Sequence, residues 1–137
     1  MTRKEALAEL IAKVEAGDIA KAPFWKVWVP EGQDGNLAYT AKQAASGSLD
    51  AAKLLHEAML PGWGWRVGGC HLSDDAFVFP DFNCPTHGER LRATVPELIN
   101  GQEWSEYTDI DQRPAGCAAR AWLLSILNAL HSMETNA

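Results

Sequence analysis

The segment AARAWLLSILNAL (118–130) is the feature that most restricts how this chain can fold. A helix is expected from 114 to 131, because proline, here Pro114, suits the first position of a helix. Two adjacent apolar rows run along it, Ala118, Trp122, Ile126 and Ala129 in one and Leu123, Leu127 and Leu130 in the other. A helix that is apolar over more than half of its circumference is mostly buried. The sequence therefore predicts a long helix at the centre of the packing.

Two further helices and several short strands are predicted upstream. A Thr-x-x-Glu capping box at Thr2 begins a helix over 3–16, and Ser48 caps a second one over 49–59. Strict alternation over 63–69 predicts a half-buried strand, which the turn 72–75 joins to a paired strand at 76–80. Shorter strands are expected at 24–29, 37–40 and 104–111, with a flexible joint at 44–48. The prediction is one α+β domain (1–137), a small and mainly antiparallel sheet with about three helices and four to five strands.

The region 81–103 is the least regular part of the pattern. Thr86 and Glu89 form a capping-box pattern before Leu91, and Pro96–Ile99 suggests one helical turn stopped by Asn100-Gly101.

The excess of acidic over basic residues limits the kinds of partner that the chain is expected to bind. The 137 residues carry 18 Asp and Glu against 12 Lys and Arg, a net charge of −6. A phosphate-binding surface needs clustered Lys and Arg, so direct nucleic-acid binding is not expected, and a basic partner is favoured instead. Three cysteines, an odd number, and an N-terminal segment charged throughout favour a reduced, cytoplasmic setting. No apolar run approaches the length of a membrane span, so no membrane association is expected.

Several stretches resemble small proteins encoded by phages and prophages, namely LIAKVEAG (10–17), YTA (39–41), SLDAA (48–52), LPGWGWRVG (60–68) and AARAWLLSILNAL (118–130). They are similar to the phage ABA sandwich family, a short arrangement of sheet and covering helices. The segment 23–30 and the longer insertion around 81–112 depart from that pattern. The resemblance implies a phage accessory protein and transfers no catalytic motif.

No catalytic or metal site is predicted, and no cofactor. Cys70-His71 and Cys84-x-x-His87 could hold a zinc ion, but neighbours in a strand point to opposite faces, which disfavours joint ligation by Cys70 and His71. The alternative is a small buried cysteine and a surface histidine. Asp74 and Asp75 suit a turn, and Asp111 precedes a helix start, so neither needs a catalytic explanation.

The surplus of aromatic residues is the strongest hint of function. Six tryptophans occur, and Trp25 and Trp28 would fall on opposite faces of the strand 24–29. Exposed tryptophan is enriched at binding hot spots. The alternative is a second layer that covers both faces of the sheet. The predicted partner-binding residues are the aromatic anchors Phe24, Trp25, Trp28 and Trp104, with Asp74, Asp75, Asp109 and Asp111 as the charged complement to a basic partner.

The leading hypothesis is a non-enzymatic phage or prophage accessory protein that binds and inhibits a host protein. A bacterial defence complex that binds nucleic acid is the most concrete target, as for an anti-CRISPR protein. One alternative is a small-molecule or nucleotide sponge, in which phosphate would be held by Arg66, Arg90, Arg92 or Arg113. The other is a zinc-stapled domain or metal-dependent hydrolase that uses Cys70, Cys84 and His87.

Overall fold

The computed structural model describes residues 2–28, 35–112 and 116–135. Within these ranges the chain forms seven helices and a three-stranded antiparallel sheet, which confirms the α+β class. The expected three helices and four to five strands match these numbers only roughly. The helices are α1 (Arg3–Glu15), α2 (Phe24–Trp28), α3 (Gly35–Ala45), α4 (Leu49–Met59), α5 (Gly88–Thr94), α6 (Ser105–Thr108) and α7 (Ala118–Thr135). The strands are β1 (Trp63–Gly69), β2 (Asp74–Pro80) and β3 (Ile110–Gln112). None of the described helices combines the length and the hydrophobicity needed to cross a membrane.

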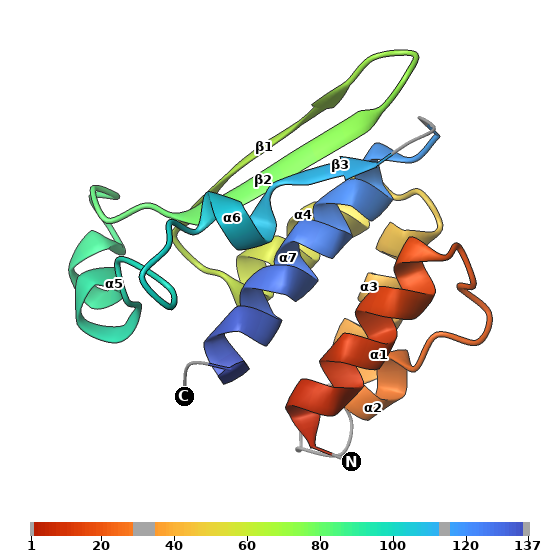
Figure 1. The fold of residues 1–137 in the computed structure, drawn as a ribbon, viewed down its shortest axis with the longest axis horizontal. Coiled ribbons are helices and arrows are strands. Elements are labelled where there is room, and N and C mark those ends of the chain that lie inside the picture. The colour runs from red at the N-terminus through yellow and green to blue at the C-terminus, as the bar shows by residue number, and fades with distance from the viewer. Residues whose placement is uncertain (1, 29–34, 113–115, 136–137) are drawn as a thin grey trace.

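Helix α7 forms the centre of the molecule, as the sequence predicts. Every residue from Ala121 to Leu127 is buried, which includes all sides of the helix. The sheet packs on one side of α7, while α1, α3 and α4 pack on its other sides (Figure 1). Burial of an apolar helix around its whole circumference explains how a chain of this length obtains one continuous core.

The predicted helix starts of α1 and α4 are confirmed. The Thr2 hydroxyl accepts a hydrogen bond from the Glu5 amide at 3.1 Å, and the Ser48 hydroxyl accepts one from the Ala51 amide at 3.0 Å. These side chains satisfy amides that have no partner within the first turn of a helix.

The sheet has the order β1-β2-β3, and β1 and β2 form the predicted hairpin. Strand β3 pairs only with Asp74–Ala76. Beyond that point two side chains take the place of a longer strand. The Val78 amide donates to the Ser125 hydroxyl at 3.0 Å, and the Thr108 hydroxyl donates to the Val78 carbonyl at 2.8 Å. Both side chains are fully buried, so the bonds tie β2 to α6 and α7.

Two predicted strands are wrong, because both segments are helical. Residues 24–28 form α2, in which Phe24, Val27 and Trp28 share the buried face at the spacing i, i+3, i+4. Pro23 precedes this helix, and its carbonyl accepts a hydrogen bond from the Lys26 amide at 3.2 Å. The expected strand 37–40 lies within α3, whose buried face consists of Ala38, Ala41, Ala44 and Ala45.

Other boundaries also differ from the prediction. The segment 104–111 is largely helix α6, and only its end enters β3. Asp74 and Asp75 belong to β2 rather than to the hairpin turn. No side chain caps α5, so the Thr86 capping box is wrong. Pro96–Ile99 forms no helical turn. Instead Ile99 pairs with Gln102 across a tight turn, in which Asn100 and Gly101 both have positive φ. Pro114 lies outside the described residues, but Gly116 and Cys117 are not helical, so α7 begins at Ala118 and ends at Thr135 instead of spanning 114–131.

Candidate functional site

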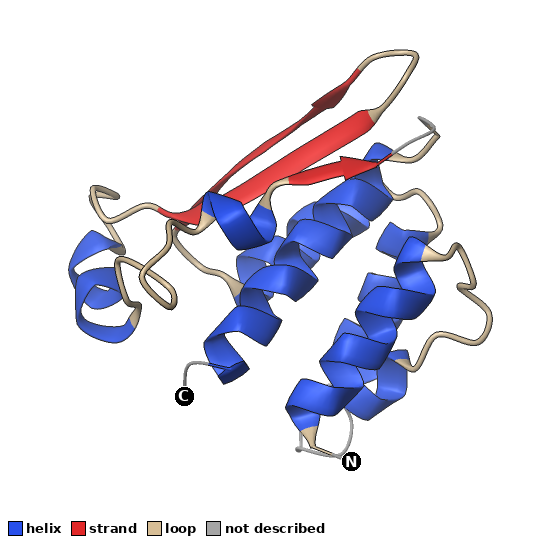
Figure 2. Cartoon of the chain, viewed as in Figure 1, coloured by secondary structure: helices blue, strands red, loops and turns tan. Residues whose placement is uncertain are grey.

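The two faces of the sheet differ in their surroundings. Figure 2 shows that helices cover one face, whereas no described helix covers the other. The covered face carries Trp63, Ala76 and Val78, all buried. Because side chains alternate along a strand, the uncovered face, which we call the open face, carries the intervening residues of β1 and β2, namely Gly64, Arg66, Gly68, Asp75, Phe77 and Phe79.

A stacked aromatic pair lies on the open face. The rings of Phe77 and Phe79 are 5.2 Å apart at an interplanar angle of 25°, and both side chains are half-buried. The Phe79 ring lies directly on Gly64, where a Cβ atom would come within 2.3 Å of it. A glycine at this position therefore lets the ring lie flat on the sheet. The result is a fixed apolar surface that remains accessible to water.

A groove of about 420 Å³ lies beside this pair. Its lining combines the apolar edge of Phe77 with the guanidinium of Arg66 and the carboxylates of Asp75 and Asp109. Asp111 lies directly opposite Asp75 in the β2–β3 register. Like charges in opposed positions destabilise a sheet, and the same arrangement produces a local negative potential that attracts cations.

The aspartates predicted to bind a partner have different roles. Asp75, Asp109 and Asp111 are exposed on or beside the open face. The carboxylate of Asp74 is less available to a partner, because it is already hydrogen-bonded within the chain. Its Oδ2 atom accepts hydrogen bonds from the Gly116 and Cys117 amides, each at 2.7 Å, at the start of α7. A carboxylate at this position satisfies free amides and interacts favourably with the helix dipole.

Three of the four predicted aromatic anchors are buried. Phe24 is 2%, Trp28 0% and Trp104 4% exposed, so these side chains cannot contact a partner at the surface. The Trp104 ring lies edge-on to Trp63 at 5.0 Å, and its Nε1 donates to the Pro96 carbonyl. Only Trp25 of the four is exposed, at 58%. It belongs to α2, against Gly35, apart from the sheet. The predicted anchors therefore do not form one surface.

A second pocket lies at the other end of β1. It has a volume of about 400 Å³ and lies among α4, β1 and the segment after β2. The side chains that matter chemically are His56, Glu57, Trp65, Cys84 and His87. Cys70 is exposed and is not part of this pocket. Among the described residues, no three His, Cys, Asp or Glu side chains come together in a group that could hold a metal ion.

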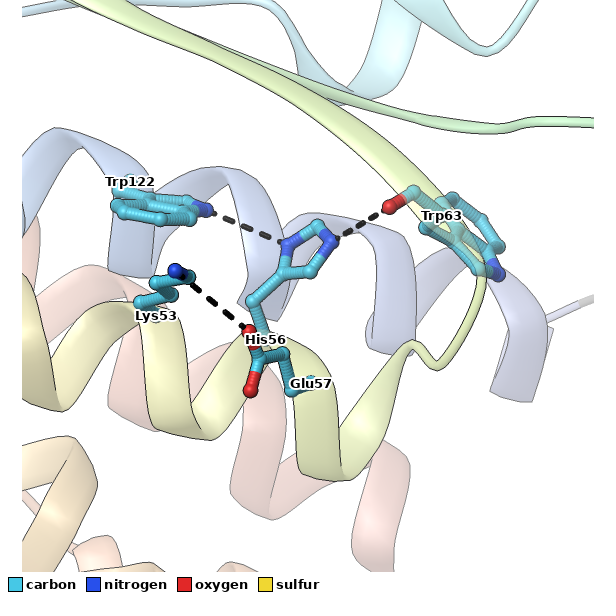
Figure 3. Close-up of polar contacts among 5 residues, drawn as sticks. All are labelled: Lys53, His56, Glu57, Trp63 and Trp122. Atoms are coloured by element: carbon cyan, nitrogen blue, oxygen red, sulfur yellow. Dashed lines mark hydrogen bonds and ion pairs between the residues drawn. The ribbon is translucent and has the colours of Figure 1, made fainter. Parts of the chain in front are cut away.

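His56 is a structural residue of this pocket (Figure 3). The indole Nε1 of Trp122 donates to its Nδ1 at 3.3 Å, which leaves the proton on Nε2, 2.9 Å from the Trp63 carbonyl. Burial lowers the pKa of His56, more than the bond to Trp63 raises it. The ring is therefore neutral and joins α4, β1 and α7.

Among the described residues, the arginines expected for a nucleotide site have different surroundings. Arg66 lines the groove of the open face, Arg90 donates to the Pro61 carbonyl at 2.8 Å, and Arg92 lines a different hollow with Glu97. Arg113 lies outside the described residues.

Sequence reasoning missed Phe77, Phe79 and Trp65 as surface residues. The signal for the phenylalanines is present in AFVFP, where they alternate with the buried Ala76 and Val78. Trp65 lies on the same face of β1 as the buried Trp63 but is 40% exposed, because β1 is an edge strand.

Comparisons with protein-family models, with curated proteins and with solved structures find no match to this chain.

Proposed function

We propose that this chain is a binding protein that docks through the open face on a basic surface of another protein. The observation that carries the proposal is the groove in which Asp75 and Asp109 lie beside the exposed edge of Phe77. An apolar centre surrounded by charged groups is typical of protein interfaces. The net charge of −6 acts in the same direction, because it attracts a positively charged partner over a distance.

The specific form of the proposal is a phage or prophage accessory protein that blocks a host protein, such as a defence complex that binds nucleic acid. Surfaces that bind nucleic acid are rich in Lys and Arg. An acidic protein that covers such a surface competes with the nucleic acid. The resemblance of the sequence to phage ABA sandwich proteins supports this setting.

The test uses two charge-matched variants of the full chain as bait in a bacterial lysate. D75N/D109N removes the carboxylates that line the groove. E89Q/E97Q removes two exposed carboxylates elsewhere, so both variants have a net charge of −4, from −6 + 2. We expect wild-type protein and E89Q/E97Q to retain the same basic protein, and D75N/D109N to retain at least about tenfold less, a difference that high salt reduces.

A third variant, F77A, removes the aromatic edge of the groove without a change in charge. We expect it to weaken retention as well, because apolar contacts supply most of the affinity of such interfaces. Equal retention of the same protein by wild type, D75N/D109N and F77A would show that the open face is not the binding surface.

A further inference from the structure

The hydrogen-bonding phase of the hairpin determines which groups of β1 face outward. The Cys70 amide donates to the Ser73 carbonyl at 2.8 Å, immediately beyond the paired strands. Hydrogen-bonded pairs alternate along an antiparallel ladder, so the next pairs of this kind are Gly68 with Asp75 and Arg66 with Phe77. The backbone groups of Trp65 and Val67 consequently point away from β2.

An independent observation gives the same phase. Val78 is the register partner of Trp65. Its amide and carbonyl are both bonded on the β3 side of the strand, to Ser125 and Thr108. Trp65 and Val78 are therefore a pair without mutual hydrogen bonds. The backbone groups of Trp63, two residues before Trp65, also point away from β2, and the Trp63 carbonyl accepts the hydrogen bond from His56.

The outer edge of β1 is open beyond Trp63. No described residue forms a hydrogen bond with the backbone of Trp65 or Val67 across this edge. Strand β1 also lacks the usual devices that prevent edge pairing, since Trp63–Gly69 contains no proline and its register with β2 is unbroken. Arg66, its only charged residue, points to the open face rather than along the edge. The edge offers two amides and two carbonyls at a spacing of about 7 Å.

A preorganised side-chain site lies beside this edge. Trp65 is 40% exposed and stacks on Trp122 at 5.5 Å with an angle of 24°, while His56 contacts it edge-on at 4.9 Å. The second pocket continues from Trp65 to the carboxylates of Asp81 and of Glu57, which forms an exposed ion pair with Lys53 at 4.0 Å (Figure 3). An aromatic face beside two carboxylates suits the aliphatic stem and cationic head of Lys or Arg.

We propose that β1 binds an extended, Lys- or Arg-containing peptide segment of the partner protein as a fourth strand. The peptide backbone pairs with Trp65 and Val67, and one cationic side chain enters the pocket beside Trp65. The inference rests on the proposed function, because the same basic partner supplies the segment. A second copy of this chain is a poorer occupant, since two chains of charge −6 repel each other.

The experiment measures binding of a defined probe to the 15N-labelled full chain. The probe is an acetylated and amidated octapeptide of alternating lysine and valine. We expect its binding to shift the amide signals of Trp65 and Val67 and to slow hydrogen exchange of the Val67 amide at least about tenfold. The same peptide with every backbone amide N-methylated keeps its charge but loses all of its backbone donors, whichever direction or register it binds in. It is expected to bind at least about tenfold more weakly. Equal affinity of the two peptides would overturn the proposal.

A variant of the chain provides the complementary test. V67P removes the outward amide and leaves the β1–β2 bonds in place, whereas V67A keeps the amide. We expect V67P to lose the octapeptide and the protein captured from lysate, and V67A to keep both.

If D75N/D109N loses the captured protein while V67P retains it, the proposed function stands and strand addition is wrong. If both variants retain it, both proposals fail. A dimer of the wild-type chain that V67P converts to monomer would show that a second copy occupies the edge, and this would also overturn the proposal.

Discussion

Asp74 and Asp75 are adjacent in the sequence and perform opposite tasks. Asp74 caps the start of α7 through two amides, whereas Asp75 lies on the open face opposite Asp111. We expect D74A to lower the free energy of unfolding by about 1 kcal/mol, the usual cost of a lost N-terminal cap. D75A should change it by less than about 0.5 kcal/mol, because it removes a like-charge pair. Urea unfolding of both variants measures the difference, and equal losses would contradict the assignment.

His56 makes the stability of the fold depend on pH. Its pKa in the folded chain is below the ordinary value, because burial opposes the charged ring. Below about pH 6.5 the unfolded chain therefore binds more protons than the folded one, and stability falls as the pH is lowered. Above about pH 7 the ring is neutral in both states, and the effect disappears.

The variant H56Q tests this dependence. Glutamine can donate to the Trp63 carbonyl but does not titrate. Urea unfolding between about pH 5 and pH 7.5 should show a shallower pH dependence for H56Q than for the wild type. Burial, with a smaller effect of Lys4, also lowers the pKa of His131, so H131Q measures that separate contribution. Identical slopes for H56Q and wild type would contradict the role of His56.

At the scale of the element, helix α2 places its two tryptophans in different surroundings. Trp28 fills the core and Trp25 faces water. We expect W28A to lower the free energy of unfolding by about 3–5 kcal/mol, the cost of truncating a large buried side chain. W25A should cost less than about 1 kcal/mol. Thermal unfolding of the two variants distinguishes them, and a larger loss for W25A would show that α2 packs on its other face.

The elements that the sequence predicts correctly have a strong periodic signal or a local cap. The apolar rows of α7, the capping box at Thr2 and the alternation over Trp63–Gly69 all depend on neighbours in sequence. The segment 24–28 has aromatic and β-branched residues, which favour a strand. Its helix is stabilised by tertiary burial of Phe24, Val27 and Trp28, whose i, i+3, i+4 spacing is a weak signal within only five residues. The buried face of α3 is made of alanines, whose weak hydrophobicity conceals the helical period.

In the candidate site too, some residues can be selected from the sequence, while others depend on contacts between segments that are distant in the chain. Asp75, Asp109 and Asp111 could be selected from the sequence as surface acids, but the capping role of Asp74 depends on contact between β2 and α7. The open edge of β1 could not be predicted, because it depends on which strand β3 joins. Trp104 is buried through its contact with Trp63, which is distant in the sequence.

On the scale of the whole molecule, α7 connects the sheet to the other helices, so the two layers are expected to unfold together. Truncation of the fully buried Leu127 to alanine should lower the free energy of unfolding by about 2–5 kcal/mol. The matched change at Leu54, which is 62% exposed, should cost less than about 1 kcal/mol. Far-ultraviolet circular dichroism and tryptophan fluorescence should give coincident transitions for L127A. Separate transitions would show that the sheet and the helical layer are independent units.

The beginning of α1 and the end of α7 meet at the pole opposite the sheet (Figure 1), where Arg3 and Glu134 form an ion pair at 3.2 Å. A short peptide linker could therefore close the chain into a ring, and new ends could be opened at the exposed Gly47 between α3 and α4. Such a circular permutant would have its ends in the loop between α3 and α4 instead of at the pole where α1 begins and α7 ends. The closeness of the beginning of α1 to the end of α7 is thus a feature that circular permutation can use.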